Sequence, residues 1–312
     1  MFKRRNTKNG SMKGKTMNII IGKTSGFCYG VKRAVENTEQ ELQKNNKPIY
    51  CLGELVHNKD VIEELQKKGL EFIENIEEAK GTTIIRAHGI KKEIYEKAQK
   101  ENIKLIDLTC PMVSKIHDLA EEYAQKEYYI FLIGKANHPE IIGTYSFCGK
   151  NSTIIENEND TEKAIKEFEK TQLKNLLIIA QTTYNLKEFE KIVEQIEQNI
   201  KKDVKLEIKN TICSATEQRQ KETDELSKQV ELMIIVGGKN SSNTNKLYEI
   251  SKNNCQNVIF VENEKDIDEN KISNFETIGI MAGASTPQKI VENIVNKINE
   301  TKNLVKKGEI YA

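Results

Sequence analysis

Three cysteines stand at matching places in the chain, each between an apolar segment and an amphipathic one. Cys28, Cys110 and Cys213 each follow a short strand-like run, and a helical pattern begins directly after each of them. Pro111 suits the first turn of a helix, where its missing N–H would have no partner. Because a helix N-terminus favours negative charge, we expect thiolates here. Three strand–cysteine–helix units in one chain predict that the sulfur atoms share one site.

Three converging thiolates favour a soft metal centre, which could be zinc or an iron–sulfur cluster. Zinc ligands usually come in C-x-x-C pairs, and the sequence contains none. Lone cysteines far apart in the chain suit a bulky cluster at a domain junction better. Three thiolates would hold three irons of a 4Fe-4S cluster and leave the fourth open to a substrate. The other cysteines have no matching positions and are expected in the core: Cys51, Cys148 and Cys255.

The spacing from each cysteine to the polar loops that follow also repeats. The first intervals are 29, 28 and 29 residues, for Cys28–His57, Cys110–His138 and Cys213–Ser242. A second group of loop residues follows the same cysteines at 60, 72 and 72 residues: His88, Thr182 and Ser285. This repeat predicts three similar α/β domains of roughly 100 residues, each with about four mostly parallel strands.

Ligands of such sheets bind at the carboxyl ends of the strands, where these polar residues fall. We therefore expect a trefoil with pseudo-threefold symmetry, in which three sheets face a common centre. The expected boundaries are 17–109 for the first unit, 110–207 for the second and 208–300 for the third. The strand at 18–21 is expected to open the first unit. The remaining segments are expected to be a disordered basic extension and a C-terminal tail: 1–16 and 301–312.

The polar loops contain groups that could bind a phosphate or a diphosphate. His57, His88 and His138 are three of the four histidines and all end predicted strands, whereas His117 falls inside a helical pattern and is expected to be structural. Hydroxyl, amide and helix-opening N–H groups form an anion nest after Gly237 and Gly238, although serine and asparagine are also common helix caps. The candidate anion-binding residues in these loops are Ser241, Ser242, Asn243 and Ser285.

Glu140 is the best candidate for a proton donor. It lies in the first turn of a predicted helix, directly after Pro139, so it could simply be a carboxylate that meets the helix dipole. The other candidate site residues include no acid, and the reductive removal of a hydroxyl group needs a proton on the leaving oxygen. In a pocket beside a cluster, Glu140 would supply that proton.

Composition limits the classes of function. The 312 residues carry 48 Lys and Arg against 47 Asp and Glu, a net charge of +1, which offers no electrostatic reason to expect nucleic acid. No apolar run approaches the roughly 18 to 20 residues of a membrane helix. Six cysteines without a secretory signal indicate thiols or metal ligands in a reducing, cytoplasmic environment. We expect a monomer without nucleic-acid or membrane partners.

Several short motifs, taken in order, resemble the 4-hydroxy-3-methylbut-2-enyl diphosphate reductase family. Each motif is short, but the ordered set is specific, and it extends from about Met17 to Ile298. This family catalyses the last step of the methylerythritol phosphate route to isoprenoids. The motifs are Gly26–Ala34, Arg86–Gly89, Asp107–Pro111, His138–Glu140, Gln181–Thr183, Thr211–Thr216, Ser241–Asn243 and Ala284–Ser285.

The resemblance implies a 4Fe-4S cluster held by Cys28, Cys110 and Cys213. It implies that Glu140 and Thr182 handle the substrate hydroxyl and its proton, in a two-electron reductive dehydroxylation that yields isopentenyl and dimethylallyl diphosphate. Electrons would come from ferredoxin or flavodoxin, because the chain lacks a nucleotide-binding Gly-x-Gly-x-x-Gly fingerprint with its acidic partner. The implied diphosphate ligands are His57, His88, His138, Ser241, Ser242, Asn243 and Ser285.

Three other functions use the same residue types. A cluster-dependent dehydratase also needs an open iron but takes no external electrons. An iron–sulfur sensor is a second alternative, although the expected diphosphate pocket and Glu140 argue against it. A zinc-dependent phosphate-binding protein is the third. The optical spectrum of the protein, purified without oxygen, separates a brown cluster protein from a colourless zinc protein.

Overall fold

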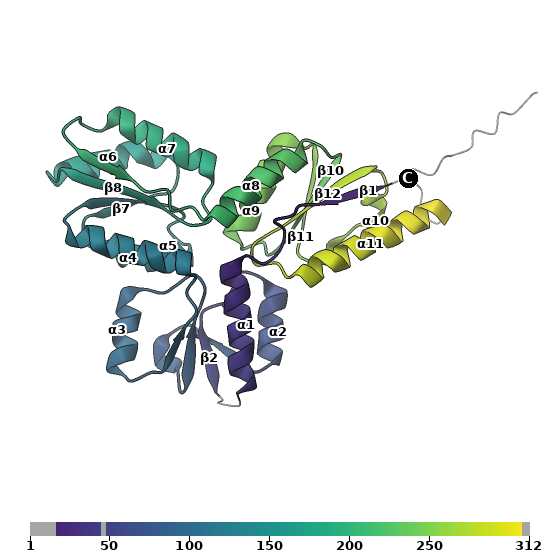
Figure 1. Cartoon of the computed structure of the whole chain (residues 1–312), viewed down its shortest axis with the longest axis horizontal. Helices are drawn as coiled ribbons and strands as arrows, with labels where there is room; N and C mark the ends of the chain where they lie inside the picture. Colours follow the sequence, from purple (N-terminus) through teal and green to yellow (C-terminus); the bar gives the residue numbers. More distant parts are fainter. Residues whose placement is uncertain (1–16, 45–47, 308–312) are drawn as a thin grey trace, which may run out of the picture.

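A computed structural model describes residues 17–44 and 48–307, with side chains up to Asn303. Within these residues, twelve strands form three separate four-stranded sheets, and every strand pair is parallel. The sheets form three lobes around a common centre, which confirms the predicted trefoil of α/β domains (Figure 1). The expected extension 1–16 lies outside the described residues.

The three sheets have the same strand order. The first contains β3 (Leu70–Ile73), β2 (Ile49–Leu52), β4 (Thr82–Ile85) and β5 (Leu105–Asp107). The second contains β7 (Ser152–Ile155), β6 (Tyr129–Ile133), β8 (Asn175–Ala180) and β9 (Lys205–Ile208). The third contains β11 (Asn257–Val261), β10 (Leu232–Val236), β12 (Thr277–Ala282) and β1 (Asn18–Ile21).

Helices give each sheet an apolar core on both faces. In β6, for example, Tyr129, Phe131 and Ile133 enter one core, whereas Ile130 and Leu132 enter the other. Strands that are buried on both faces have continuous apolar sequences, which explains the apolar runs in the amino-acid sequence. The α-helices of the described residues are α1 (Tyr29–Gln43), α2 (Lys59–Lys67), α3 (Lys92–Lys100), α4 (Pro111–Gln125), α5 (Pro139–Tyr145), α6 (Thr161–Lys170), α7 (Leu186–Asn199), α8 (Ser214–Ser227), α9 (Ser242–Asn254), α10 (Glu269–Ile272) and α11 (Gln288–Lys307).

The strand that precedes each cysteine forms the edge of a sheet in a different domain from the helix that follows. β5 belongs to the first sheet and leads to Cys110 and α4, and β9 belongs to the second sheet and leads to Cys213 and α8. β1 completes the third sheet by pairing with β12, from Asn18 beside Thr277 to Ile21 beside Ile280. Each cysteine therefore lies where the chain passes from one domain to the next, at the junction of the lobes.

Two expected boundaries are wrong. The strand at 18–21 does not open the first domain, because it forms the edge of the third sheet, where it pairs with β12, more than 250 residues away in sequence. The expected tail 301–312 is helical as far as Lys307, where α11 ends, and residues 308–312 lie outside the described residues. None of the described helices is long and apolar enough to cross a membrane.

Candidate functional site

The three repeat-related cysteines line one cavity at the junction of the domains. Cys28, Cys110 and Cys213 are the residues directly before α1, α4 and α8, and none of their side chains caps its helix. The cavity measures about 720 Å³ including its open mouth. It is lined by every predicted site residue: Cys28, His57, His88, Cys110, His138, Glu140, Thr182, Cys213, Ser241, Ser242, Asn243 and Ser285.

The backbone of each cysteine is anchored in an equivalent way to the domain whose edge strand precedes it. The N–H of Cys28 donates to the carbonyl of Ala284 at 3.1 Å, that of Cys110 to Ala87 at 3.0 Å, and that of Cys213 to Thr182 at 3.0 Å. Ala284 and Ala87 directly precede Ser285 and His88. The threefold repeat thus fixes every cysteine beside a loop that carries a polar site residue.

The thiols lie close enough to influence one another. Burial raises the pKa of Cys110, the backbone N–H groups of Met112 and Val113 oppose this rise, and the neighbouring thiols of Cys28 and Cys213 add to it. The helix terminus is therefore not sufficient to give the free thiolate expected from the sequence. A β-carbon at Gly30 would lie 2.5 Å from the Cys110 Sγ atom, so the site needs glycine there. Three soft donors that repel one another when ionised fit a bound metal centre.

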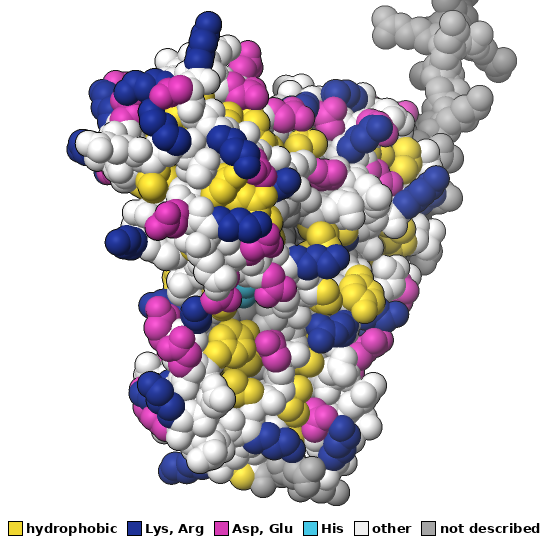
Figure 2. Space-filling view, turned by 60° about the vertical axis from the view of Figure 1, so that its left-hand side comes forward, with side chains coloured by type: hydrophobic (Ala, Val, Ile, Leu, Met, Phe, Trp, Pro, Cys, Tyr) yellow, Lys and Arg dark blue, Asp and Glu magenta, His cyan; other side chains and the backbone are white. Residues whose placement is uncertain are grey.

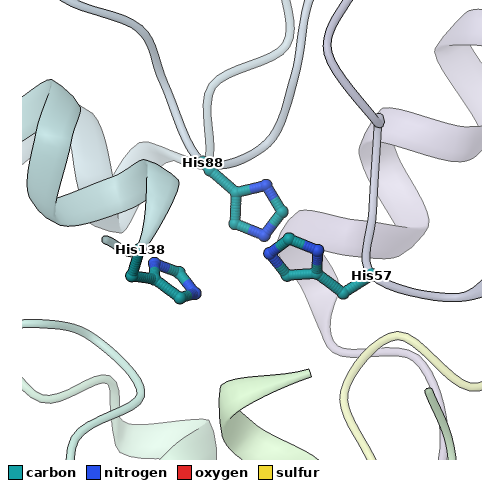
Figure 3. Close-up of side chains that lie close together, drawn as sticks. All are labelled: His57, His88 and His138. Carbon is teal, nitrogen blue, oxygen red and sulfur yellow. The ribbon is translucent and has the colours of Figure 1, made fainter. Parts of the chain in front are cut away.

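Three histidine rings meet in the same cavity. Their ring centroids are 4.3 Å apart for His57 and His88, 5.5 Å for His57 and His138, and 5.6 Å for His88 and His138 (Figure 3). Both ring nitrogens of His57 and the Nδ1 atom of His88 are buried without a hydrogen-bond partner. The Nδ1 atom of His138 accepts a hydrogen bond from the Glu140 N–H at 3.2 Å.

Burial keeps these imidazoles neutral. Desolvation lowers the pKa of His57, lowers that of His88 well below 6.5 and lowers that of His138 to about 3, and the Arg86 guanidinium adds to each effect. The Glu54 carboxylate lies 3.7 Å from the His57 Nδ1 atom, beyond hydrogen-bond reach. One nitrogen from each ring lies within 4.8 Å of the others, so the geometry could accept a metal ion. The charge of Arg86 favours an anion instead.

Glu140 and Thr182 form a buried pair beside the histidines. Glu140 is 2% exposed, and burial raises the pKa of its carboxyl group to about 7, although hydrogen bonds from Thr182 oppose that rise. Glu140 lies in the first turn of α5 in the second domain, while Thr182 follows β8 of the same domain. This pKa places the carboxyl group near the middle of its titration at neutral pH, as a proton donor requires.

The third domain contributes hydroxyl and amide groups. The Ser241 hydroxyl accepts a hydrogen bond from the Thr244 N–H at 3.3 Å and so caps α9, while the Ser285 hydroxyl donates to the His57 carbonyl at 3.0 Å. The Ser242 hydroxyl lies 3.4 Å from the Gln181 amide nitrogen. The Asn243 amide is 3% exposed, and neither its nitrogen nor its oxygen has a partner. Buried amides are almost always paired, so this one indicates a ligand.

The cysteines and the histidine interpreted as structural lie where they were expected. Cys51, Cys148 and Cys255 are buried in apolar cores, and His117 stacks on Phe147 with ring centroids 4.4 Å apart. On the face shown in Figure 2, acidic and basic side chains are intermingled, and a histidine is visible in the recess between the lobes. One charged residue of the cavity wall was missed: Arg219, which no local pattern distinguishes from other charged residues of a polar helix.

Fold and cavity together define a class of protein: three α/β domains that enclose one pocket with thiols, neutral imidazoles and a carboxyl group. The model of one family, described as LytB protein, matches residues 19–299. The chain belongs to this family.

Curated relatives carry the name 4-hydroxy-3-methylbut-2-enyl diphosphate reductase. The protein from Thermoanaerobacter sp. (strain X514) is 42% identical over 287 residues, which cover 90% of this chain and 96% of the relative. The protein from Aquifex aeolicus is 36% identical over 288 residues, which cover 91% of this chain and 96% of that relative. Among solved structures, the reductase from Plasmodium falciparum superposes with a TM-score of 0.82 at 32% identity, covering 90% of this chain and 87% of that one. Another reductase structure is described as the terminal enzyme of the non-mevalonate pathway. It superposes with a TM-score of 0.66 at 37% sequence identity, and the match covers 91% of this chain and 100% of that chain.

Proposed function

We propose that this chain removes the hydroxyl group of 4-hydroxy-3-methylbut-2-enyl diphosphate by reduction. The reaction consumes two electrons and two protons, releases the hydroxyl oxygen as water and leaves isopentenyl or dimethylallyl diphosphate. One observation carries the proposal: all twelve residues expected from the sequence line a single cavity where the three domains meet. Relatives that carry the name of this reductase span nearly the whole chain, which supports the same substrate here.

We propose that Cys28, Cys110 and Cys213 hold a 4Fe-4S cluster. Each comes from a different inter-domain junction, none is engaged in capping its helix, and the cavity leaves room beside them. Such a cluster, when bound, supplies electrons and a Lewis-acidic iron. The chain contributes the shape and the lining of the pocket.

The histidines and the third-domain loop would bind the diphosphate. The free nitrogens of His57 and His88 and both polar atoms of the Asn243 amide are buried without partners, which is costly in the free protein. Phosphate oxygens would satisfy the N–H groups among them, and the hydroxyl groups of Ser242 and Ser285 can turn to donate as well. The Arg86 guanidinium adds positive charge that acts on the histidines.

Glu140 would deliver a proton through Thr182. When Glu140 is protonated, its Oε2 atom can donate to the Thr182 hydroxyl, which lies 2.7 Å away, and that hydroxyl can turn its own proton toward the substrate oxygen. The pair is buried, so bulk water does not compete for this proton. The relay would thus neutralise the leaving oxygen.

We also propose that the protein works as a monomer in the cytoplasm, with ferredoxin or flavodoxin as its electron donor. A single chain supplies all the walls of the cavity, so no second copy is needed to complete the site. The described cysteines are all unpaired, which suits a reducing compartment.

The test is to purify and reconstitute the protein without oxygen, measure iron and sulfide, and supply the substrate with a reduced donor. We expect a brown protein with one cluster per chain that forms both products and consumes two electrons per substrate. A colourless protein with stoichiometric zinc would refute the proposal. Substrate loss without electron consumption would indicate a redox-neutral dehydratase instead.

A further inference from the structure

Arg219 is a buried cation in the wall of the cavity, on the helix α8 that begins directly after Cys213. It is 3% exposed. Its Nε and Nη2 atoms donate to the Thr24 carbonyl at 2.9 and 2.6 Å, and Nη2 also donates to the Gly26 carbonyl at 2.9 Å. These carbonyls belong to the loop that leads to Cys28. One arginine thus connects the segments that carry two of the three cysteines.

The contacts of this guanidinium leave its charge uncompensated. Its partners are neutral carbonyl groups, and among the described residues no carboxylate comes within ion-pair distance of it. The nearby Glu222 carboxylate is occupied by the backbone N–H groups of Lys23 and Thr24 and by the Thr24 hydroxyl, at 2.5 to 2.8 Å. A buried charge without a counter-charge is strongly unfavourable, so a negative group is expected beside it.

Among the negative groups, Cys28 and Cys213 have the strongest electrostatic effect on Arg219. Burial lowers the pKa of Arg219, and negative charge on Cys28 and then on Cys213 opposes that change more than Glu222 does. The Nη1 atom of Arg219 is also buried without any partner. The side chain therefore has both an unbalanced positive charge and an unused N–H donor in a cavity wall shared with the three thiols.

We propose that Arg219 is a positioning residue that stabilises the reduced form of the metal centre held by Cys28, Cys110 and Cys213. This inference rests on the proposed iron–sulfur function. Three thiolates make the assembled centre negative, and each added electron makes it more so. A fixed buried cation lowers the free energy of the more negative state, and reduction potentials of such clusters respond to charge and to hydrogen bonds on sulfur. Arg219 thereby makes the centre easier to reduce.

A purely structural role for Arg219 predicts something different. If the residue only ties the 24–26 loop to α8, its loss would lower the amount of bound iron but leave the potential of the remaining clusters unchanged. Arg33 provides a matched control, because its Nη1 atom donates to the carbonyl of Thr109, directly before Cys110, at 3.1 Å. It too is an arginine clamp beside a cluster ligand, yet it is not among the charges that shift the pKa of Cys110.

The test is a dithionite titration with redox mediators, monitored by electron paramagnetic resonance, on anaerobic cluster-loaded protein without substrate. Arg219→Gln keeps N–H donors but removes the charge, Arg219→Lys keeps the charge, and Arg33→Gln is the control. For Arg219→Gln we expect a roughly tenfold lower equilibrium constant for one-electron reduction, about 59 mV more negative. The equilibrium constants for one-electron reduction of Arg219→Lys and Arg33→Gln should stay within roughly threefold of the wild-type value.

Three results would overturn the inference. The first is an equilibrium constant for one-electron reduction of Arg219→Gln that lies within roughly threefold of the wild-type value. The second is a shift of the same size in Arg33→Gln. If Arg219→Gln assembles no cluster, the third result is measured on Arg219→Lys, which keeps the positive charge. A roughly tenfold change in its equilibrium constant for reduction would show that the charge of Arg219 does not set the potential. Wild-type protein without a cluster signal would refute the proposed function itself, before any variant is compared.

Discussion

Thr182 donates both of its hydrogen bonds to a single carboxyl group, one to each oxygen of Glu140. The Thr182 N–H lies 2.6 Å from Oε1, and its hydroxyl oxygen lies 2.7 Å from Oε2. Both bonds favour the ionised carboxylate, yet burial outweighs them and raises the pKa of Glu140 to about 7. A buried, near-neutral acid joined to a hydroxyl is suited to deliver a proton.

Glu140→Gln should fold, hold its cluster and bind substrate, but fail in turnover. The amide keeps the shape and the hydrogen-bonding reach of the carboxyl group and cannot supply the proton, so we expect a loss of about 10² to 10⁴-fold. Steady-state turnover and the substrate-induced change in the cluster spectrum are the two measurements. Glu188→Gln, at a partly exposed carboxylate paired with Lys246, is the control and should turn over like the wild type. Turnover of Glu140→Gln within a few-fold of the wild type would exclude this role.

The same carboxyl group should make stability depend on pH. The folded-state pKa of Glu140 is raised from 4.5 to about 7, so its contribution to stability is fully present below pH 4.5 and lost as pH rises through 7. Glu140→Gln lacks this loss. Its stability relative to the wild type should therefore increase by about 2 to 3 kcal/mol between pH 5 and pH 8, as measured by anaerobic urea unfolding of both proteins. A constant difference would mean that Glu140 is not buried as a neutral acid.

His88→Ala should weaken diphosphate binding. Loss of one hydrogen bond to a charged ligand costs on the order of 1.5 to 3 kcal/mol, roughly a 10- to 150-fold weaker complex. Calorimetric titration with inorganic diphosphate measures this directly. His117→Gln is the control, since His117 stacks on Phe147 and is not one of the residues that line the cavity, and it should stay within about threefold of the wild type. Unchanged affinity in His88→Ala would contradict the pocket assignment.

Diphosphate binding should take up protons. The free rings are neutral at pH 7, because burial lowers the pKa of His88 well below 6.5 and that of His138 to about 3. A bound anion favours the charged imidazolium and raises those pKa values, so affinity should increase as pH falls toward 6. Binding heats measured in buffers of different ionisation enthalpy will report the number of protons taken up. Identical heats in all buffers would show that the histidines bind as neutral donors.

Cys28→Ser, Cys110→Ser and Cys213→Ser should each lose the cluster or nearly all activity. Hydroxyl oxygen is a poor ligand for this soft centre. Cys148→Ser is the matched control, because Cys148 is 1% exposed in a core, and its Sγ atom lies 3.4 Å from the Thr144 carbonyl, a contact that serine can keep. Cys255→Ser should also behave like the wild type. Iron content per chain tests the set, and normal iron in Cys110→Ser would refute the ligand assignment.

Local patterns in the sequence were sufficient for most secondary-structure elements and for the twelve candidate residues that line the cavity. The helices that follow Cys28, Cys110 and Cys213 begin directly after each cysteine, as the helix-start signals predict. The site could be predicted because parallel sheets place strand ends together, so polar residues after apolar runs converge. That relation needs only the order of elements along the chain.

Which strands pair was decided by the tertiary structure alone. Alternation of side chains describes a strand but does not name its neighbour, and the partner of the strand at 18–21 is β12, near the other end of the chain. Arg219 illustrates the same limit for the site. In the sequence it is one charged residue of a polar helix, and its role depends on the carbonyls of Thr24 and Gly26, almost 200 positions away. Only folding buries that charge beside the thiols, because desolvation depends on what surrounds a group in space.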